Sequence, residues 1–514
     1  MKEEQSEKTK RIAKNTIMLY IRMLFGMMVS LYTSRIVLQT LGVEDYGIYN
    51  VVGGFVAMFS LISNSLSSSV SRFLTFELGK GNIEKLKTVF STSVLIHIVL
   101  AIIVFICAES IGVWFLNTQM TIPAERLTAA NWVFQASIVS FMFGLFSVPY
   151  NASIVSHEKM TAFAFIGILN ILLNLSIVLF LAFTSVTFDK LIAYSVLLVI
   201  VSISLQFIYV IYCLKHFEEC RLKIRFDKEY WKEISSFAGW NFIGCTAGLL
   251  KDQGVNILLN LFIGPILNAA RGIAGTVNNA VSSFAANFMM ALNPQITKSY
   301  ASGEHAYMFS LVERGSRFSY FIMLILTLPI ILEAEFILSL WLGDFPDHTV
   351  NFVRLILTLS LLDILSNTLI TLQNATGKIR NYQIVVGGAL LLNFPLSYLC
   401  LFLGFPPEST LIVAIIVAVL CLSLRLSFLH RMVGLSILSF LKNVLLKVLI
   451  VTVLTAFLPL LLHLSMEMAW QRFIVVTAVS LFCTLGCIYY VGCNTYEQQF
   501  ILRQCSLLKE KLKL

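Results

Sequence analysis

The sequence predicts an all-α, polytopic membrane protein of about fourteen transmembrane helices, with two pseudo-symmetric six-helix lobes around a central cavity and two further C-terminal helices. Three observations predict this fold: the composition, the recurrence of long apolar runs, and an internal repeat. Hydrophobic residues make up 58% of the 514 residues and charged residues only 13%, and the mean hydropathy is +0.84. A water-soluble core cannot bury so much apolar surface, so the bilayer must serve as the solvent.

The apolar runs recur along the whole chain, and each is long enough to cross about 30 Å of hydrocarbon as a helix. Continuous runs such as 95–105 and 412–422 favour helices over the alternating segments of a β-barrel. The first run is too long for a cleaved signal peptide and contains Arg22 and Arg35, so we expect it to remain as the first span. The predicted spans are 16–41, 47–70, 89–116, 130–154, 161–184, 190–213, 234–263, 267–293, 310–342, 349–373, 382–403, 409–428, 444–463 and 473–492.

The basic residues predict the topology. The net charge is +9, but the charges alternate between loops instead of clustering on one soluble domain, which argues against nucleic-acid binding. A cytoplasmic N-terminus places 29 of the 37 Lys and Arg on the cytoplasmic side and only three, Arg126, Lys190 and Arg472, on the opposite side. The positive-inside rule therefore predicts an inner-membrane, multi-pass protein with both termini in the cytoplasm.

Two halves of the chain match each other. A shift of 222 residues superposes Gly42 on Gly264 and Gly81 on Gly303, and shifts of 223 and 220 relate 151–152 to 374–375 and Gly167 to Gly387. Six helices per half place both copies in the same orientation, as in parallel repeats whose lobes rock around a substrate site. The predicted domains are an N-lobe at 1–215, a cytoplasmic linker at 216–233, a C-lobe at 234–430, and the last two helices with a cytoplasmic tail at 431–514.

The ten cysteines are scattered and form no Cys-x-x-Cys pair, and the seven histidines are equally dispersed. No disulfide framework or metal site is indicated. We expect no cofactor beyond a coupling Na⁺ or H⁺.

Three segments resemble a known family. They are SRIVLQTLGVEDYGIYNVVGG at 34–54, YNASIVSHEKM at 150–160 and NAARGIAGTVNNAVSSFAANFMMALNPQITKSYASG at 268–303. With the two lobes and the basic linker, they resemble the Wzx-type flippases of O-antigen and capsular polysaccharide, a branch of the multidrug, oligosaccharidyl-lipid and polysaccharide (MOP) exporter superfamily. The resemblance implies movement of an undecaprenyl-diphosphate-linked oligosaccharide from the cytoplasmic to the periplasmic leaflet by alternating access, with polysaccharide polymerase or assembly proteins as further partners. Related lipid II flippases carry an arginine near the start of the second helix, where this chain has Ile48, Tyr49 and Asn50.

Basic residues inside the spans are candidates for binding the diphosphate, because an unpaired charge in the bilayer is costly. Arg22 lies about 9 Å inside the first span, and Lys251 lies near the middle of the seventh. With Arg35 and Arg271, they are predicted to line a basic central cavity, since arginine and lysine both bind phosphate. Alternatively, Arg35 and Arg271 anchor helix ends, and Lys251 pairs locally with Asp252.

Small polar residues form stripes on the second and eighth spans, and Asn64 and Asn278 are the candidate substrate-binding amides on them. Repeat symmetry places these two stripes toward the cavity. Such residues equally allow close helix packing in lipid.

Asp252 and Asp363 are the most deeply placed acids of the second half, and Asn256 and Asn367 each follow by four residues on the same helix face. Carboxylate and amide oxygens suit a hard monovalent cation, and a carboxylate can carry a proton. This resembles the cation site in the second lobe of related exporters. The alternative is two separate packing or salt-bridging aspartates.

Two other functions were weighed. A multidrug cation antiporter of the same superfamily would prefer an acidic cavity. A membrane polymerase or glycosyltransferase would need a large outside loop or a nucleotide-sugar site, and the longest candidate outside loop is about 117–129, without a P-loop in the chain. A transporter that is not an enzyme is the favoured interpretation.

Overall fold

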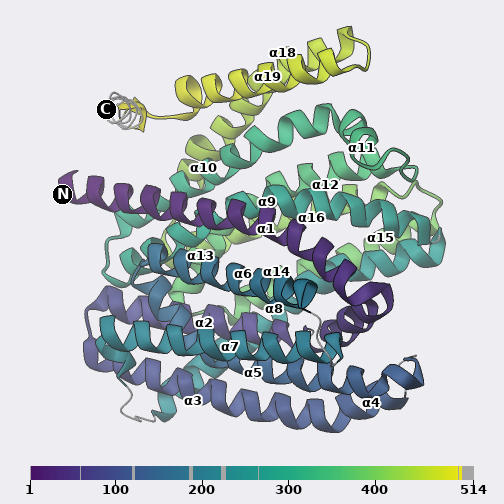
Figure 1. Cartoon of the computed structure of the whole chain (residues 1–514). Helices are drawn as coiled ribbons and strands as arrows, with labels where there is room; N and C mark the ends of the chain where they lie inside the picture. Colours follow the sequence, from purple (N-terminus) through teal and green to yellow (C-terminus); the bar gives the residue numbers. More distant parts are fainter. Residues whose placement is uncertain are drawn as a thin grey trace, which may run out of the picture. The chain divides into compact units, whose positions relative to one another are not determined.

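The computed structural model describes residues 2–57, 59–118, 122–184, 189–221, 227–263, 265–495 and 497–499, and these residues form helices joined by short turns, with no strand among them. Eleven of the described helical segments are long and apolar enough to cross a membrane. The helices, drawn in Figure 1, are α1 Lys2–Ala57, α2 Ser60–Lys80, α3 Ile83–Cys107, α4 Val113–Thr118, α5 Leu127–Ser156, α6 Met160–Phe183, α7 Lys190–His216, α8 Lys228–Phe262, α9 Pro265–Ala301, α10 His305–Leu332, α11 Ala334–Leu342, α12 Thr349–Ile364, α13 Asn367–Thr376, α14 Arg380–Leu391, α15 Asn393–Phe402, α16 Ser409–Val433, α17 Ile437–Phe440, α18 Lys447–Ser465 and α19 Trp470–Cys487.

Each of the fourteen predicted spans falls on helix, but several helices begin and end elsewhere. The first helix, α1, continues past the predicted end at 41 to Ala57, with a break in its helical geometry at Gly42, where φ is 84°. The predicted span 47–70 is consequently divided between the end of α1 and the start of α2. Further short breaks divide α10 from α11, α12 from α13, and α14 from α15.

The chain forms two compact units that differ from a simple division at the linker. Unit 1 contains 1–246, 290–304 and 375–380, and unit 2 contains 247–289, 305–374 and 381–514. Helices α8 and α9 therefore each contribute residues to both units.

Unit 1 is built around α5, which packs against α1, α2, α3 and α7. Its core includes Val70, Leu74, Phe90 and Ile154, which are almost completely buried. Polar contacts hold the start of α8 against α2, because the hydroxyl of Ser65 donates to the carbonyl of Ala238 at 2.6 Å. Small side chains thus permit close helix packing here.

One glycine pair of the predicted repeat can be compared at two helix ends. Gly81 terminates α2 with φ at 71°, and Gly303 follows α9 with φ at 77°. Glycine adopts this left-handed conformation without the steric cost that a Cβ brings. The glycine pair aligned by the 222-residue shift therefore has the same structural role in both halves; Gly264, the partner of Gly42, lies outside the described residues.

An ion cluster ties together three elements of unit 1. The Arg126 guanidinium donates to both carboxylate oxygens of Asp45 in α1 and, at 2.5 Å, to Asp189. Asp189 also caps α7 by accepting from the amide groups of Leu191 and Ile192. Burial alone would raise the pKa of the Asp189 carboxyl, but the Arg126 and backbone hydrogen bonds outweigh it and lower that pKa below its ordinary value.

Helices α18 and α19 of unit 2 lie side by side (Figure 1) and are joined to α10 at both ends. At one end Arg317 of α10 donates to both oxygens of Glu497 at 2.6 and 2.7 Å. At the other end Glu333 accepts from His463 of α18 at 2.9 Å and from Arg472 of α19 at 3.1 Å. Arg317 and Arg472 are buried in these contacts. Both are among the charges assigned to loops in the topology argument, Arg317 to the cytoplasmic side and Arg472 to the opposite side, and the excess of basic residues on one side survives without them.

Candidate functional site

The charged residues of unit 2 meet on α8 and α12. Lys251 of α8 is only 9% exposed, and its Nζ lies 3.7 Å from Oδ2 of Asp363 near the end of α12. The Asp363 side chain remains 45% exposed while Lys251 is covered. The structure therefore joins a residue from the predicted diphosphate set to one from the predicted cation set in a single ion pair.

Two interrupted helices surround this pair. The first break separates α12 from α13 at Leu365 and Ser366, and the hydroxyl of Ser316 donates to the free carbonyl of Leu365 at 2.9 Å. The second break separates α14 from α15 at Leu392, and the following Asn393 donates its side-chain amide to the carbonyl of Lys251 at 3.3 Å. Discontinuous membrane helices commonly form substrate and ion sites, because their ends offer unpaired backbone groups.

A third charged residue, Arg425 of α16, belongs to the same region and was missed as a site residue. It is 7% exposed and donates from Nε to the Tyr382 hydroxyl at 3.0 Å and from Nη1 to Ser366 at 2.9 Å. The sequence did carry a signal, since Arg425 lies inside an otherwise apolar run of α16, and a charge in such a run marks a functional candidate.

The buried thiol of Cys421 lies in the same region. It interacts electrostatically with Arg425, Asp363 and Lys251. Among the described side chains of this cluster are therefore two cations and one carboxylate.

Of the other predicted residues of unit 2, Asn256 lies on α8, and Arg271 and Asn278 lie on α9. Asn367 begins α13, so the break after α12 separates it from Asp363, with which it was predicted to share one continuous helix. Asn256, Asn367 and Arg271 are half-buried. Asn278 is also half-buried and accepts from Ser282 one turn later at 3.2 Å. The side chain of Asp252 lies outside the described residues, so its predicted pairing with Lys251 stays a prediction.

Arg22 is held inside unit 1 by α6 and α7. Its guanidinium lies 4.5 Å from the centre of the Phe163 ring and interacts electrostatically with Tyr209. Its side chain fills the space above Gly167, where an added Cβ would lie 2.5 Å from Nε. The side chain of Arg35 lies outside the described residues.

Asn64 of α2 is exposed. The serines that bond α8 are on the neighbouring face: Ser69 donates to Ile234 at 3.1 Å, as Ser65 does to Ala238. The face carrying Asn64 is thus separate from the face used in this packing.

Comparison with known proteins gives a family and a fold for the chain. A family model described as "Polysaccharide biosynthesis protein" matches residues 12–300, more than half of the chain. No curated protein matches it.

Solved structures share the fold at low identity. An outward-facing multidrug resistance MATE family transporter of the MOP superfamily superposes with a TM-score of 0.71 at 13% identity, covering 84% of this chain and 97% of that chain. The MATE transporter ClbM in complex with Rb⁺ gives 0.68 at 12%, covering 84% and 96%. A MOP superfamily transporter from Pyrococcus furiosus, whose binding pocket is described as having reverse polarity that suggests a different function, also gives 0.68 at 12%, covering 82% and 96%. The chain is therefore a multi-pass membrane protein with a MATE-like transporter fold.

Proposed function

The chain belongs to the polysaccharide biosynthesis protein family, and from this premise we propose that it is a lipid-linked oligosaccharide flippase. Its substrate would be an undecaprenyl-diphosphate-linked polysaccharide repeat unit, moved from the cytoplasmic to the periplasmic leaflet of the inner membrane by alternating access. The fold and the family are those of transporters, which favours transport over polymerase or glycosyltransferase chemistry.

The observation that carries the proposal is the buried Lys251 beside a half-exposed Asp363. A lysine inside a membrane protein is costly unless its charge has a use or a partner. With Arg425 nearby, the cluster offers a mobile ammonium and a guanidinium, the two side-chain types that bind phosphate. A diphosphate approaching this cluster would meet two cationic side chains.

The same ion pair supports cation coupling. A cation or proton bound at Asp363 and a phosphate bound at Lys251 would each break the Lys251–Asp363 pair. Two binding events that share one interaction are thermodynamically linked, and the linkage is reciprocal. We propose Asp363 as the coupling carboxylate, with Asn367 and, through α8, Asp252 and Asn256 as its companions.

A multidrug cation antiporter is the second candidate, because a multidrug resistance transporter shares the fold. The two cations of the cluster disfavour a cationic drug. The MOP superfamily transporter whose pocket is described as having reverse polarity is a precedent, on the same fold, for a binding pocket of different polarity.

The test is complementation of a flippase-deficient strain, with surface polysaccharide measured per unit of protein in the membrane. Lys251→Ala should abolish export and Lys251→Arg should retain part of it, because charge matters more than shape. Asp363→Asn should impair export and change its ion dependence. The exposed residues Lys85 and Asp344 supply matched controls, and Lys85→Ala and Asp344→Asn should export like the wild type.

Arg22 is tested in the same strain, where Arg22→Lys should partly function and Arg22→Gln should not. Wild-type export by both Lys251→Ala and Arg22→Gln would contradict the basic-cavity mechanism, while leaving the fold intact. Drug resistance conferred by the wild type without export would favour the antiporter.

A further inference from the structure

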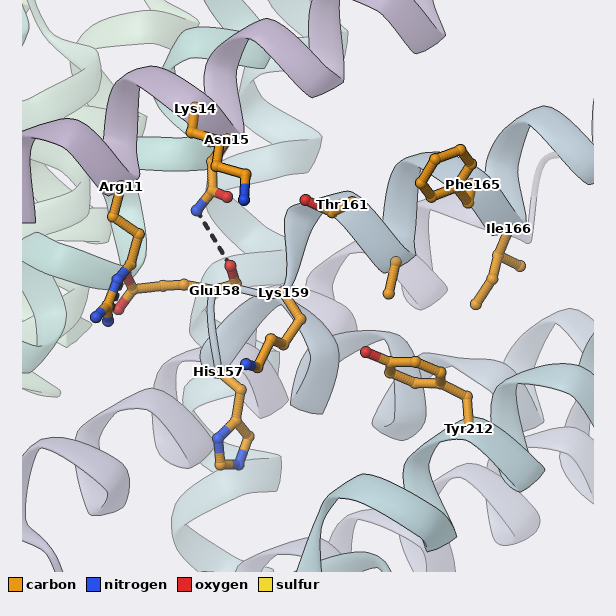
Figure 2. Close-up of a pocket in the computed structure, with 11 residues that line it drawn as sticks. Arg11, Lys14, Asn15, His157, Glu158, Lys159, Thr161, Phe165, Ile166 and Tyr212 are labelled. Atoms are coloured by element: carbon orange, nitrogen blue, oxygen red, sulfur yellow. Dashed lines mark hydrogen bonds and ion pairs between the residues drawn. The ribbon is translucent and has the colours of Figure 1, made fainter.

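Unit 1 contains a cavity of about 620 Å³, separate from the residues considered so far. Figure 2 shows that α1, the turn between α5 and α6, the start of α6, and α7 all contribute to its wall. The charged side chains on it are Arg11 and Lys14 of α1 and Glu158 and Lys159 of the turn; the other lining residues are Asn15, His157, Thr161, Ala162, Phe165, Ile166 and Tyr212.

Glu158 is already bound by groups other than the pocket cations. Its side chain is 2% exposed, and its two carboxylate oxygens accept from Lys298 at 2.5 Å and Gln295 at 2.5 Å, both on the end of α9. Arg11 lies farther away, at 3.9 Å. Because Lys298 balances this carboxylate, Glu158 leaves the pocket with an excess of positive charge.

The two lysines of the pocket are exposed to a ligand. Lys14 and Lys159 are both exposed, and within the described part of the chain neither ammonium forms a salt bridge. The ring of His157 is held by Glu219 at 2.6 Å and stacks on Phe217. The pocket therefore presents Arg11, Lys14 and Lys159 from two elements that are fixed in place by the Glu158 contacts.

The remaining wall combines apolar side chains with the Thr161 and Tyr212 hydroxyls and the Asn15 amide, which donates to the Glu158 carbonyl at 3.1 Å. Phe165 and Ile166 lie on one side of the cavity in Figure 2, and the Tyr212 hydroxyl points into the space between them and Lys159. Phe165 is 60% exposed, so the apolar side continues onto the outer surface of the helices. A wall that is cationic on one side and apolar on the other suits an anionic headgroup attached to a hydrocarbon chain.

We propose that this pocket binds the phosphate headgroup of a lipid, with Arg11, Lys14 and Lys159 contacting the phosphate and Phe165 and Ile166 contacting the adjoining apolar chain. Two lipids carry this chemistry: an anionic phospholipid of the bilayer and the polyprenyl diphosphate of the transported lipid. Only the second source rests on the proposed function. In that case the pocket is a first docking place, distinct from the Lys251 cluster of unit 2.

The test measures lipid binding to the purified full-length protein in neutral detergent by native mass spectrometry. The probes are undecaprenyl diphosphate, phosphatidylglycerol, uncharged undecaprenol and inorganic diphosphate. The double variant Lys14→Ala/Lys159→Ala should weaken binding of the phosphate-bearing lipid roughly 25-fold, about fivefold for each lysine near a membrane surface. Lys14→Arg/Lys159→Arg should retain binding, and so should Lys85→Ala/Lys228→Ala, which removes two exposed lysines of unit 1 outside the pocket. Unchanged thermal unfolding of each variant establishes that it is folded.

Preference for undecaprenyl diphosphate over phosphatidylglycerol supports the transported lipid as the ligand, and the opposite preference supports a bilayer phospholipid. Equal binding of undecaprenol, or binding by the double alanine variant at the wild-type level, overturns the proposal. An equal loss of lipid binding in Lys85→Ala/Lys228→Ala overturns the proposal as well, because the loss would then follow from the lower net charge of the protein and not from the pocket. If the double variant binds normally while Lys251→Ala still abolishes export, the pocket is wrong and the proposed function stands. If the double variant loses phosphatidylglycerol while the wild type exports nothing, the pocket stands and the proposed function fails.

Discussion

Arg22 and Lys251 are held in different ways although both are cations in apolar helices. Arg22 lies against the Phe163 ring, a contact in which a ring face attracts a cation. Lys251 has a carboxylate partner at 3.7 Å. An aromatic neighbour leaves the full charge of Arg22 available to a substrate. The ion pair of Lys251 with its carboxylate must instead break before Lys251 can bind a substrate anion.

The position of Arg22 depends on Gly167, which gives a prediction at the residue scale. In Gly167→Ala, the new Cβ would lie 2.5 Å from Arg22 Nε, so the guanidinium must move off Phe163. We expect export to fall severalfold because the Arg22 charge is displaced. The amount of protein in the membrane should stay normal, since alanine favours a helix by about 1 kcal/mol over glycine. The measurement is surface polysaccharide in the flippase-deficient strain.

Gly144 of α5 is the matched control, because a Cβ there meets nothing within 4 Å. Gly144→Ala should export normally. Equal export by the two alanine variants would show that the position of Arg22 has no effect on transport.

A charged residue could be predicted as a site residue only where its neighbours in the sequence made it stand out. Arg22 and Lys251 interrupt apolar runs and were found for that reason. Glu158 lies in a polar turn between two spans, and only the fold shows that Lys298, far along the chain, covers it. Pairing of Lys251 with its neighbour Asp252 was the alternative that the sequence offered and stays a prediction, whereas the ion pair with Asp363 requires knowledge of how α8 and α12 pack.

At the scale of elements, buried ion pairs connect the last part of the chain with α10 and with Glu333, the residue that follows α10. Glu333 is completely buried and bonds His463 and Arg472 near the α18–α19 connection. Contacts of this kind are costly to break, because removing one partner leaves a buried charge without compensation. The last two helices therefore belong structurally to unit 2.

Glu333→Gln should destabilise unit 2 by about 3 kcal/mol, because Arg472 would keep its charge and lose its carboxylate partner. The measurement is the thermal unfolding of purified protein in detergent, which should shift to lower temperature. Glu335→Gln, two residues away on the exposed side of α11, should leave the unfolding temperature unchanged. A matching shift in the two variants would contradict a stabilising role for the Glu333 contacts.

The breaks inside predicted spans show what apolar patterns do not reveal. Span positions follow from hydropathy, because any apolar run of about 20 residues must cross the bilayer. At the helix break, the carbonyl of Leu365 instead accepts a hydrogen bond from the hydroxyl of Ser316, a residue about fifty positions earlier. Nothing in the local sequence 349–373 specifies that contact, so a continuous helix was predicted there.

At the scale of the whole molecule, the helical fold and its spans were predictable from composition and apolar periodicity, and the shared conformation of Gly81 and Gly303 agrees with the repeat. The division into two units was harder to predict from the sequence. Residues 290–304 at the end of α9 pack with unit 1, through contacts such as Lys298 with Glu158. Sequence order alone assigns them to the second half.

The orientation in the membrane remains a prediction with a direct test. The excess of Lys and Arg on one side places both termini in the cytoplasm. Single cysteines at 120, 186 and 345, introduced into a variant without the native cysteines, should react with a membrane-impermeant thiol reagent in intact cells. Protection of any of these positions until the membrane is opened would contradict this topology.

The central claim is that the protein moves an anionic lipid-linked saccharide, and the most direct measurement is translocation in proteoliposomes that contain only the purified protein. A fluorescent undecaprenyl-diphosphate saccharide in the outer leaflet is followed by its protection from a membrane-impermeant quencher, with a cationic drug measured in parallel. The account predicts protection of the lipid-linked saccharide by the wild type, loss of protection in Lys251→Ala at equal protein content, and no transport of the drug. Drug transport without movement of the saccharide, or equal saccharide movement by wild type and Lys251→Ala, would contradict it.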